Sequence, residues 1–186
     1  FFSTFNASAV KDVQLYKGSM PAHYGGRLAS VLDIRMKDGN DQQLGVSGSL
    51  GLISSNLTVE GPVAKKRASF IVAARRTYAD MLLKLFGDPS VRDNKLYFYD
   101  LNAKVNHRFS DKDRLYLSFY TGKDKFYLDL KEEDDFGGQR DEFTTSSGLG
   151  WGNLTSALRW NHVLSPRLFA NTTLTYSRYK FDTRAA

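Results

Sequence analysis

The histidines are the side chains of this 186-residue chain best suited to metal binding or proton transfer. His23, His107 and His162 stand singly and far apart, without the short His-x-x-x-His or His–carboxylate spacing of a ligand pair. Cysteine is absent, so the chain offers no thiolate to a metal or to a nucleophilic reaction. We therefore expect no catalytic residues, no metal site and no cofactor, and we predict that the protein is not an enzyme.

Two glycine-containing motifs resemble functional motifs, a phosphate-binding loop and a nucleophile elbow, but do not match them. Gly25-Gly26-Arg27 has neither a following helix nor the Lys-Ser/Thr of a phosphate-binding loop. Gly48-Ser49-Leu50-Gly51 is one residue short of a nucleophile elbow, and its serine lies in a strand pattern. The glycines at 25 and 26 instead indicate a turn with positive φ after Tyr24.

The densest charge cluster is acidic and lies in residues 132–135. It lacks the Asp-x-Asp-x-Asp-Gly spacing of a calcium loop. We expect a solvated loop over residues 129–148, which in an external position would meet a cationic ligand or a divalent ion. The net charge of +6 is spread among 20 acidic residues, and Lys65-Lys66-Arg67 is the compact basic cluster. This distribution argues against nucleic-acid binding.

Period-two alternation of apolar and polar residues predicts an all-β, antiparallel fold. In residues 96–109, for example, Tyr97, Tyr99 and Leu101 alternate with Phe98 and Asp100. The same pattern predicts seven strands in all, at residues 42–51, 54–63, 68–78, 96–109, 114–128, 149–164 and 167–182.

Strand length and loop length favour a transmembrane β-barrel over a soluble β-sandwich, which also alternates. Several predicted strands reach the roughly 9–11 residues that cross a bilayer. Tight turns alternate with long polar connections at 79–95 and 129–148, as in outer-membrane barrels. Aromatic residues near the strand ends are candidates for interfacial girdles: Tyr97, Tyr99, Phe109, Trp160 and Tyr179. The seventh strand lacks a return partner, so the chain is expected to be a fragment of a larger barrel.

The segment before these strands carries a recognisable pattern. A strand ending at Gly18 is followed by Pro21, Tyr24 and Gly25, and then by a strand with apolar positions from Val31 to Met36. The segment resembles the end of the plug domain in TonB-dependent outer-membrane transporters. It differs from the sugar-importer branch of that family, which favours Asp-Ala-x-Ala where residues 18–21 read Gly-Ser-Met-Pro.

This resemblance implies a division into the C-terminal part of a plug domain, residues 1–40, and the first strands of a barrel, residues 41–186. The complete barrel would have about 22 strands. The implied function is import of a scarce ligand across the outer membrane of a Gram-negative cell, driven by a TonB-type complex that contacts a segment outside this chain. Outer-membrane lipid and a surface lipoprotein are further expected partners. The alternative is a passive porin-like barrel or a scaffold for surface lipoproteins.

Three sets of residues follow from this interpretation. The plug turn comprises Gly18, Pro21, Tyr24, Gly25, Gly26 and Arg27. The charges expected on the lumen face, where they would contact the plug, are Glu60, Arg75, Asp100, Lys104 and Arg108. Residues 78–87 break the alternation and predict a short amphipathic helix whose apolar side packs on the barrel rim or on a partner lipoprotein. The ligand-binding residues stay unassigned.

Overall fold

A computed structural model describes residues 6–18, 21–22, 24–26, 29–88, 92, 94–136 and 139–185. For the described residues within 129–144, it describes the backbone alone. Two antiparallel sheets make up the fold. Strands β1 (Val10–Lys17) and β2 (Ser30–Met36) pair into a hairpin. The other seven strands form one meander in which each pairs with its neighbours in sequence: β3 (Gly45–Leu50), β4 (Ser54–Ala64), β5 (Ala68–Thr77), β6 (Lys95–Arg108), β7 (Asp113–Phe136), β8 (Gln139–Ser165) and β9 (Leu168–Ala185).

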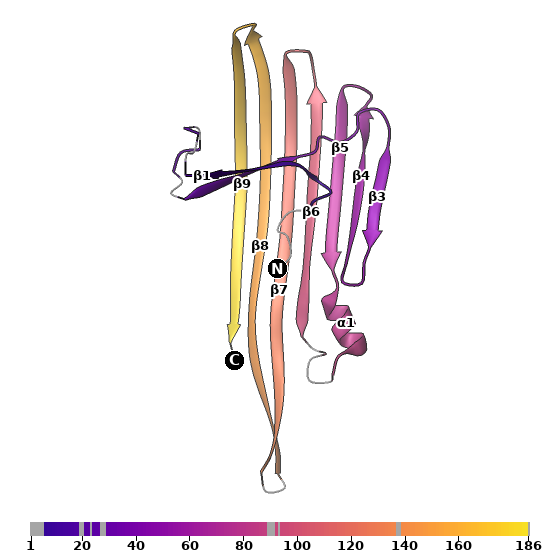
Figure 1. The fold of residues 1–186 in the computed structure, drawn as a ribbon, viewed down its shortest axis with the longest axis vertical. Coiled ribbons are helices and arrows are strands. Elements are labelled where there is room, and N and C mark those ends of the chain that lie inside the picture. The colour runs from indigo at the N-terminus through magenta and orange to yellow at the C-terminus, as the bar shows by residue number, and fades with distance from the viewer. Residues whose placement is uncertain are drawn as a thin grey trace.

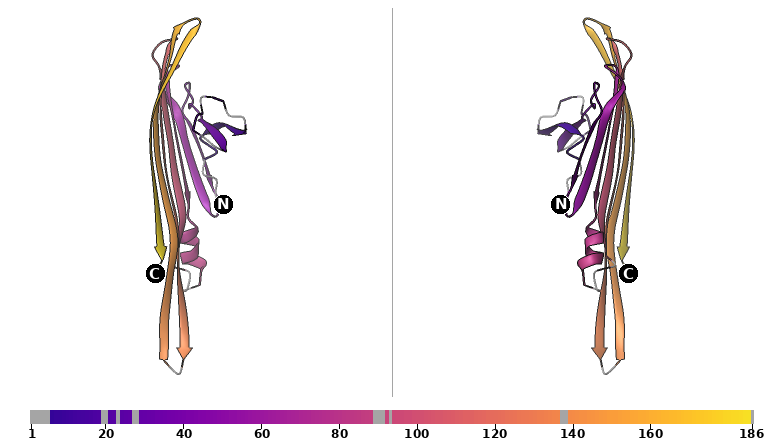
Figure 2. Two further views of the ribbon diagram at one scale, coloured as in Figure 1. Left: turned by 90° about the vertical axis from the view of Figure 1, so that its left-hand side faces the viewer. Right: turned by 90° about the vertical axis from the view of Figure 1, so that its right-hand side faces the viewer.

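The hairpin lies across the large sheet. In Figure 1 β1 runs roughly at right angles to β7, β8 and β9, and the two views of Figure 2 place the hairpin on one side of the sheet. We call the side that faces this N-terminal segment the inner face and the opposite side the outer face. The tight turns after β4, β6 and β8 all lie at one end of the sheet, opposite the end that carries α1.

The polarity of the sheet is the reverse of that in a soluble sandwich. Along β6, the inner-face side chains Asp100 and Lys104 are 4% and 7% exposed. The outer-face side chains Tyr99 and Val105, which flank this pair in the sequence, are 41% and 42% exposed. A soluble sheet would bury the apolar face and expose the polar one, so this sheet covers its polar side and leaves its apolar side open.

The cross-strand register shows that the outer face is also apolar on the neighbouring strands. Val105 is opposite Leu117, which is opposite Leu158, which is opposite Leu174, so four apolar side chains form one row on the outer face. Tyr179 is an exception to the expected aromatic girdle. It lies opposite Asn153, in step with the inner face, because an odd number of residues separates it from Leu174 on the outer face.

The seven predicted barrel strands are all present, but the expected loop at 129–148 was wrong. Strands β7 and β8 continue pairing without interruption to Phe136 and Gln139, so the acidic residues 132–135 belong to β7. The β-favouring run Phe143-Thr144-Thr145 stands opposite 130–132 and extends the ladder. Strand β3, at the opposite edge of the sheet from β9, is shorter than the expected 42–51, since it begins at Gly45.

The predicted helix is present as α1 (Ala79–Phe86). The N–H of Gly87 donates to the carbonyl of Leu83 and closes its last turn (2.8 Å). Met81, Leu85 and Phe86 are exposed, so the described residues leave this apolar side uncovered. Within the described parts of the chain, no helix is long and apolar enough to span a membrane.

Candidate functional site

The chain crosses from the hairpin to the large sheet through residues 37–44, and Asp38 is its main anchor there. The ammonium of Lys104, on β6, lies 2.7 Å from the Asp38 carboxylate and also donates to the carbonyl of Met36 at 3.1 Å. The Asp38 carbonyl accepts from the Ser69 hydroxyl and from the Asn106 amide, each at 2.8 Å. Residues 36–38 are therefore bound to two strands of the inner face by polar contacts.

The next residue, Gly39, is positioned where only glycine fits. Its φ of +83° lies in the left-handed region, and a Cβ at this site would overlap the backbone carbonyl of Phe70. The backbone of the crossing therefore rests directly on β5. Ile71, the apolar residue that interrupts the polar pattern of β5, is 1% exposed on this same face.

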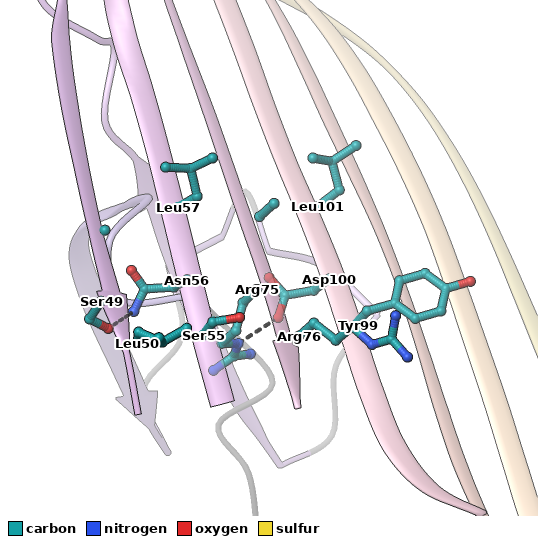
Figure 3. Close-up of a pocket in the computed structure, with 12 residues that line it drawn as sticks. Ser49, Leu50, Ser55, Asn56, Leu57, Arg75, Arg76, Tyr99, Asp100 and Leu101 are labelled. Carbon is teal, nitrogen blue, oxygen red and sulfur yellow. Dashed lines mark hydrogen bonds and ion pairs between the residues drawn. The ribbon is translucent and has the colours of Figure 1, made fainter. Parts of the chain in front are cut away.

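A second polar cluster on the inner face joins β5 and β6. Arg75 on β5 and Asp100 on β6 are opposite each other in register, and their Nε and Oδ2 atoms are 2.6 Å apart (Figure 3). Asn102 donates a further hydrogen bond to Asp100 at 3.1 Å, and the Arg75 guanidinium lies 4.8 Å from the centre of the Phe98 ring. Figure 3 also shows Ser49 and Asn56 joined across β3 and β4. Ser49, Asn56, Arg75 and Asp100 are among the residues that line a pocket of about 600 Å³, together with Leu57 and Leu101 of the outer face.

Cations also gather around Tyr116 on the inner face of β7. The Lys104 ammonium lies 5.3 Å and the Arg159 guanidinium 4.5 Å from the ring centre. Arg114 donates to the Tyr116 hydroxyl at 3.4 Å. This arrangement gives the inner face a positive area next to the Asp38 anchor.

The five expected lumen charges all lie on the inner face by register, and the structure gives them different partners. Lys104 contacts the N-terminal segment, whereas Arg75 and Asp100 pair with each other. Arg108 donates to the carbonyl of Lys66 in the neighbouring tight turn (2.8 Å). Glu60 stands opposite Gly45 and Ile71. In the N-terminal hairpin, Asp33 and Arg35 form an ion pair within β2 (3.5 Å).

The plug-turn residues are only partly described. The N–H of Tyr24 donates to the carbonyl of Pro21 (3.0 Å), and the Tyr24 ring lies 5.6 Å from that of Tyr16. Positive φ occurs at Gly18 and Gly26 (+83° and +75°), but not at Gly25, so that part of the expectation was wrong. Arg27 and His23 lie outside the described residues.

Sequence reasoning missed Asp38, Ser69 and Asn106 as contact residues. The alternation did place Ser69 and Asn106 on the polar face, but only charged residues were singled out there. Asp38 sits in the non-repetitive segment Lys37-Asp38-Gly39-Asn40, where no periodicity indicates a direction. The available signal was Gly39, because a glycine next to an acid at a domain boundary indicates a close backbone approach.

A different acid, Asp113, holds the tight-turn end of the sheet together. Its carboxylate accepts from the Trp160 indole N–H (3.2 Å), and its Oδ1 atom is 2.5 Å from Nδ1 of His162. The hydrogen bond with His162 is the main reason that the pKa of Asp113 is lowered from its ordinary value. In the described part of the chain, no group of three histidine or acidic side chains is placed to hold a metal ion.

Comparison with known proteins gives no relative for this chain. A scan against family models, a search of curated proteins and a search of solved structures each returned no match.

Proposed function

We propose that this chain is part of a β-barrel of the outer membrane, that its N-terminal segment occludes the lumen, and that the protein imports a scarce ligand by energy-coupled displacement of this segment. The observation that carries the proposal is the reversed polarity of the sheet together with the N-terminal segment bound to its polar side. Both features follow from one arrangement, in which lipid contacts the outer face and a plug fills the inside.

The outer face supports the membrane part of the proposal. A soluble protein rarely exposes a contiguous apolar patch of more than a few hundred Å². Here the apolar rows of the outer face extend from Trp160 and Leu115 to Leu101 and Leu57 across five strands, and Trp160 and Leu57 at their two ends are 45% and 52% exposed. Along β6, the eight residue steps from Val105 to Tyr97 cover about 26 Å, close to the apolar band of about 25 Å on outer-membrane barrels.

The contacts of the N-terminal segment support the movable-plug part. Asp38 is 41% exposed on its side chain, so its pair with Lys104 is open to water. An ion pair with one partner open to water is weaker than a fully buried pair, whose rupture costs about 3–5 kcal/mol. A few hydrogen bonds and one pair of this kind would hold the segment in place and would still yield to a pulling force.

A passive porin or a scaffold for surface lipoproteins is the second candidate. The exposed apolar side of α1, with Met81, Leu85 and Phe86, is the observation in its favour, since a surface partner would cover it. A passive barrel has no need of a segment anchored on its inner face. Energy-dependent movement of that segment distinguishes the two functions.

The test uses Ser69→Cys in the full-length protein, because Ser69 is 2% exposed beneath Asp38. Cells are treated with a membrane-impermeant maleimide with and without an uncoupler of the inner-membrane proton gradient. Energy-coupled displacement predicts faster labelling in energised cells. Asp88→Cys, at an exposed site after α1, is the control and should be labelled at the same rate in both. Equal labelling of position 69 with and without the uncoupler would favour the passive barrel.

A further inference from the structure

The outer face becomes strongly basic beyond its apolar band, on the side away from the tight turns. Seven cationic side chains lie in step with the outer face there: Arg76, Lys95, Lys123, Lys125, Arg178, Lys180 and Arg184. We call them the basic band. They come from β5, β6, β7 and β9, so the positive charge extends across most of the sheet.

Register fixes the arrangement of the basic band. Lys123 stands opposite Tyr99 on one side and Gly152 on the other, and Gly152 stands opposite Lys180. One row nearer the tight turns, Arg178 of the basic band stands opposite Leu154, and Leu101 lies in the same row. The basic band therefore begins at the edge of the apolar surface, where Tyr97 and Tyr99 also lie, their rings stacked at 6.4 Å.

Strand β8 lies between the cationic side chains of β7 and those of β9, and its residues there present no side chain on the outer face. Gly148, Gly150 and Gly152 of β8 occupy alternate positions between β7 and β9. Tyr127 and Asp182 meet across this gap through a hydrogen bond, and a Cβ at Gly150 would overlap the Asp182 carboxylate. At Gly152, by contrast, the nearest atom to an added Cβ is the Gly122 carbonyl, at 3.6 Å. A hollow with a backbone floor thus lies between Lys123 and Lys180, which are two strand spacings, or about 10 Å, apart.

The charge balance of this surface is strongly positive. Among the side chains that the structure describes, Asp182 is the acid on this stretch of the outer face, and it is engaged by Tyr127. Two long flexible lysines on either side of an open hollow can converge on one anionic group, and phosphate offers three acceptor oxygens to them.

We propose that the basic band binds the phosphate groups of an anionic lipid in the outer leaflet, with Lys123 and Lys180 on either side of one phosphate above Gly152. This inference rests on the proposed membrane barrel. A lipid fits better than a free anion or an acidic protein, because the cations adjoin an apolar surface and tyrosines typical of the headgroup level. The acyl chains would cover the apolar outer face from Leu101 and Leu154 toward the tight turns.

The experiment uses the full-length protein in nanodiscs of phosphatidylcholine, with and without bisphosphorylated lipid A, and measures bound lipid A by native mass spectrometry. The double variant Lys123→Gln/Lys180→Gln should weaken lipid A binding about tenfold or more. Lys65→Gln/Lys112→Gln removes the same charge from the tight-turn end of the sheet and should leave binding unchanged. Gly152→Val keeps every charge but fills the hollow, and it should also weaken binding.

Two results would overturn the proposal. One is equal lipid A binding by Lys123→Gln/Lys180→Gln and by the turn control. The other is complete displacement of lipid A by millimolar inorganic phosphate, which would identify a site for free anions. If wild-type protein inserts into nanodiscs but shows no preference for lipid A, the lipid site alone fails. If it does not insert at all, the membrane barrel fails with it.

Discussion

The ammonium of Lys104 lies 2.7 Å from the carboxylate of Asp38, and 66 residues of chain separate the two. Lys104 belongs to the sixth strand, whereas Asp38 follows the N-terminal hairpin, so this pair joins the two sheets. Lys104 is almost fully buried. Removing its partner would leave a buried charge with only the Met36 carbonyl as acceptor.

Asp38→Asn should therefore loosen the N-terminal segment without preventing assembly of the large sheet. We expect a loss of about 1–2 kcal/mol in the free energy of local opening, less than for a fully buried pair because Asp38 is partly exposed. Amide hydrogen exchange of residues 36–40 in the full-length protein measures it. Asp33→Asn breaks the ion pair inside β2 and should leave exchange at 36–40 unchanged. Equal exchange in wild type and Asp38→Asn would show that the pair does not anchor the segment.

Gly39→Val should displace the crossing from β5. The φ of +83° and the overlap of a Cβ with the Phe70 carbonyl each oppose a β-branched residue, at a cost of about 1–3 kcal/mol for the backbone alone. Gly25→Val is the matched control, because its φ is not positive and no atom of the described residues lies within 4 Å of an added Cβ. Protease sensitivity of residues 10–40 compares them. Resistance of Gly39→Val equal to that of Gly25→Val would contradict this close approach.

The two faces of the sheet should respond differently to arginine. Leu117→Arg or Leu174→Arg places a charge in the apolar row and should destabilise the membrane-inserted protein by about 2–4 kcal/mol. Ser118→Arg and Thr173→Arg, one residue away on the inner face, should have far smaller effects. Urea unfolding from lipid vesicles gives the difference. Similar losses on both faces would mean that the outer face does not contact lipid.

The Asp113–His162 contact should make stability depend on pH at the tight-turn end of the sheet. The pKa of Asp113 is lowered in the folded protein, so its contribution is complete above the ordinary aspartate pKa of about 4 and is lost as pH falls through the folded value. Denaturation midpoints between pH 2 and 6 should show this loss in wild type. Asp113→Asn should abolish that component, and an unchanged pH profile in this variant would refute it.

The strands were predictable because period-two alternation is local and survives in every one of them. Leu115 and Leu117 against Tyr116 and Ser118, for example, fix both the strand and its two faces. The extension of β7 and β8 to residues 136 and 139 was not predictable in this way. Charge density in residues 132–135 indicates a loop, yet continuous backbone pairing with 140–143 outweighs it.

The contacts between the two sheets were less predictable than the sheets themselves. Lys104 was identified as an inward charge, but its partner depends on how the segment after β2 crosses the sheet. No local pattern fixes the direction of Asp38, because residues 37–44 have neither a helical nor a strand period. The assignment of positive φ to Gly26 and not to Gly25 likewise depends on the geometry of the turn, which two adjacent glycines leave open.

The central claim is that the N-terminal segment occludes a membrane barrel, and single-channel conductance in planar lipid bilayers tests it most directly. The full-length protein should insert and conduct little or no current. A variant in which everything up to Asn40 is deleted should insert equally well and form large, stable open channels, because the inner face is polar and no longer covered. Large channels in the full-length protein, or a deletion variant that inserts without conducting, would contradict the account.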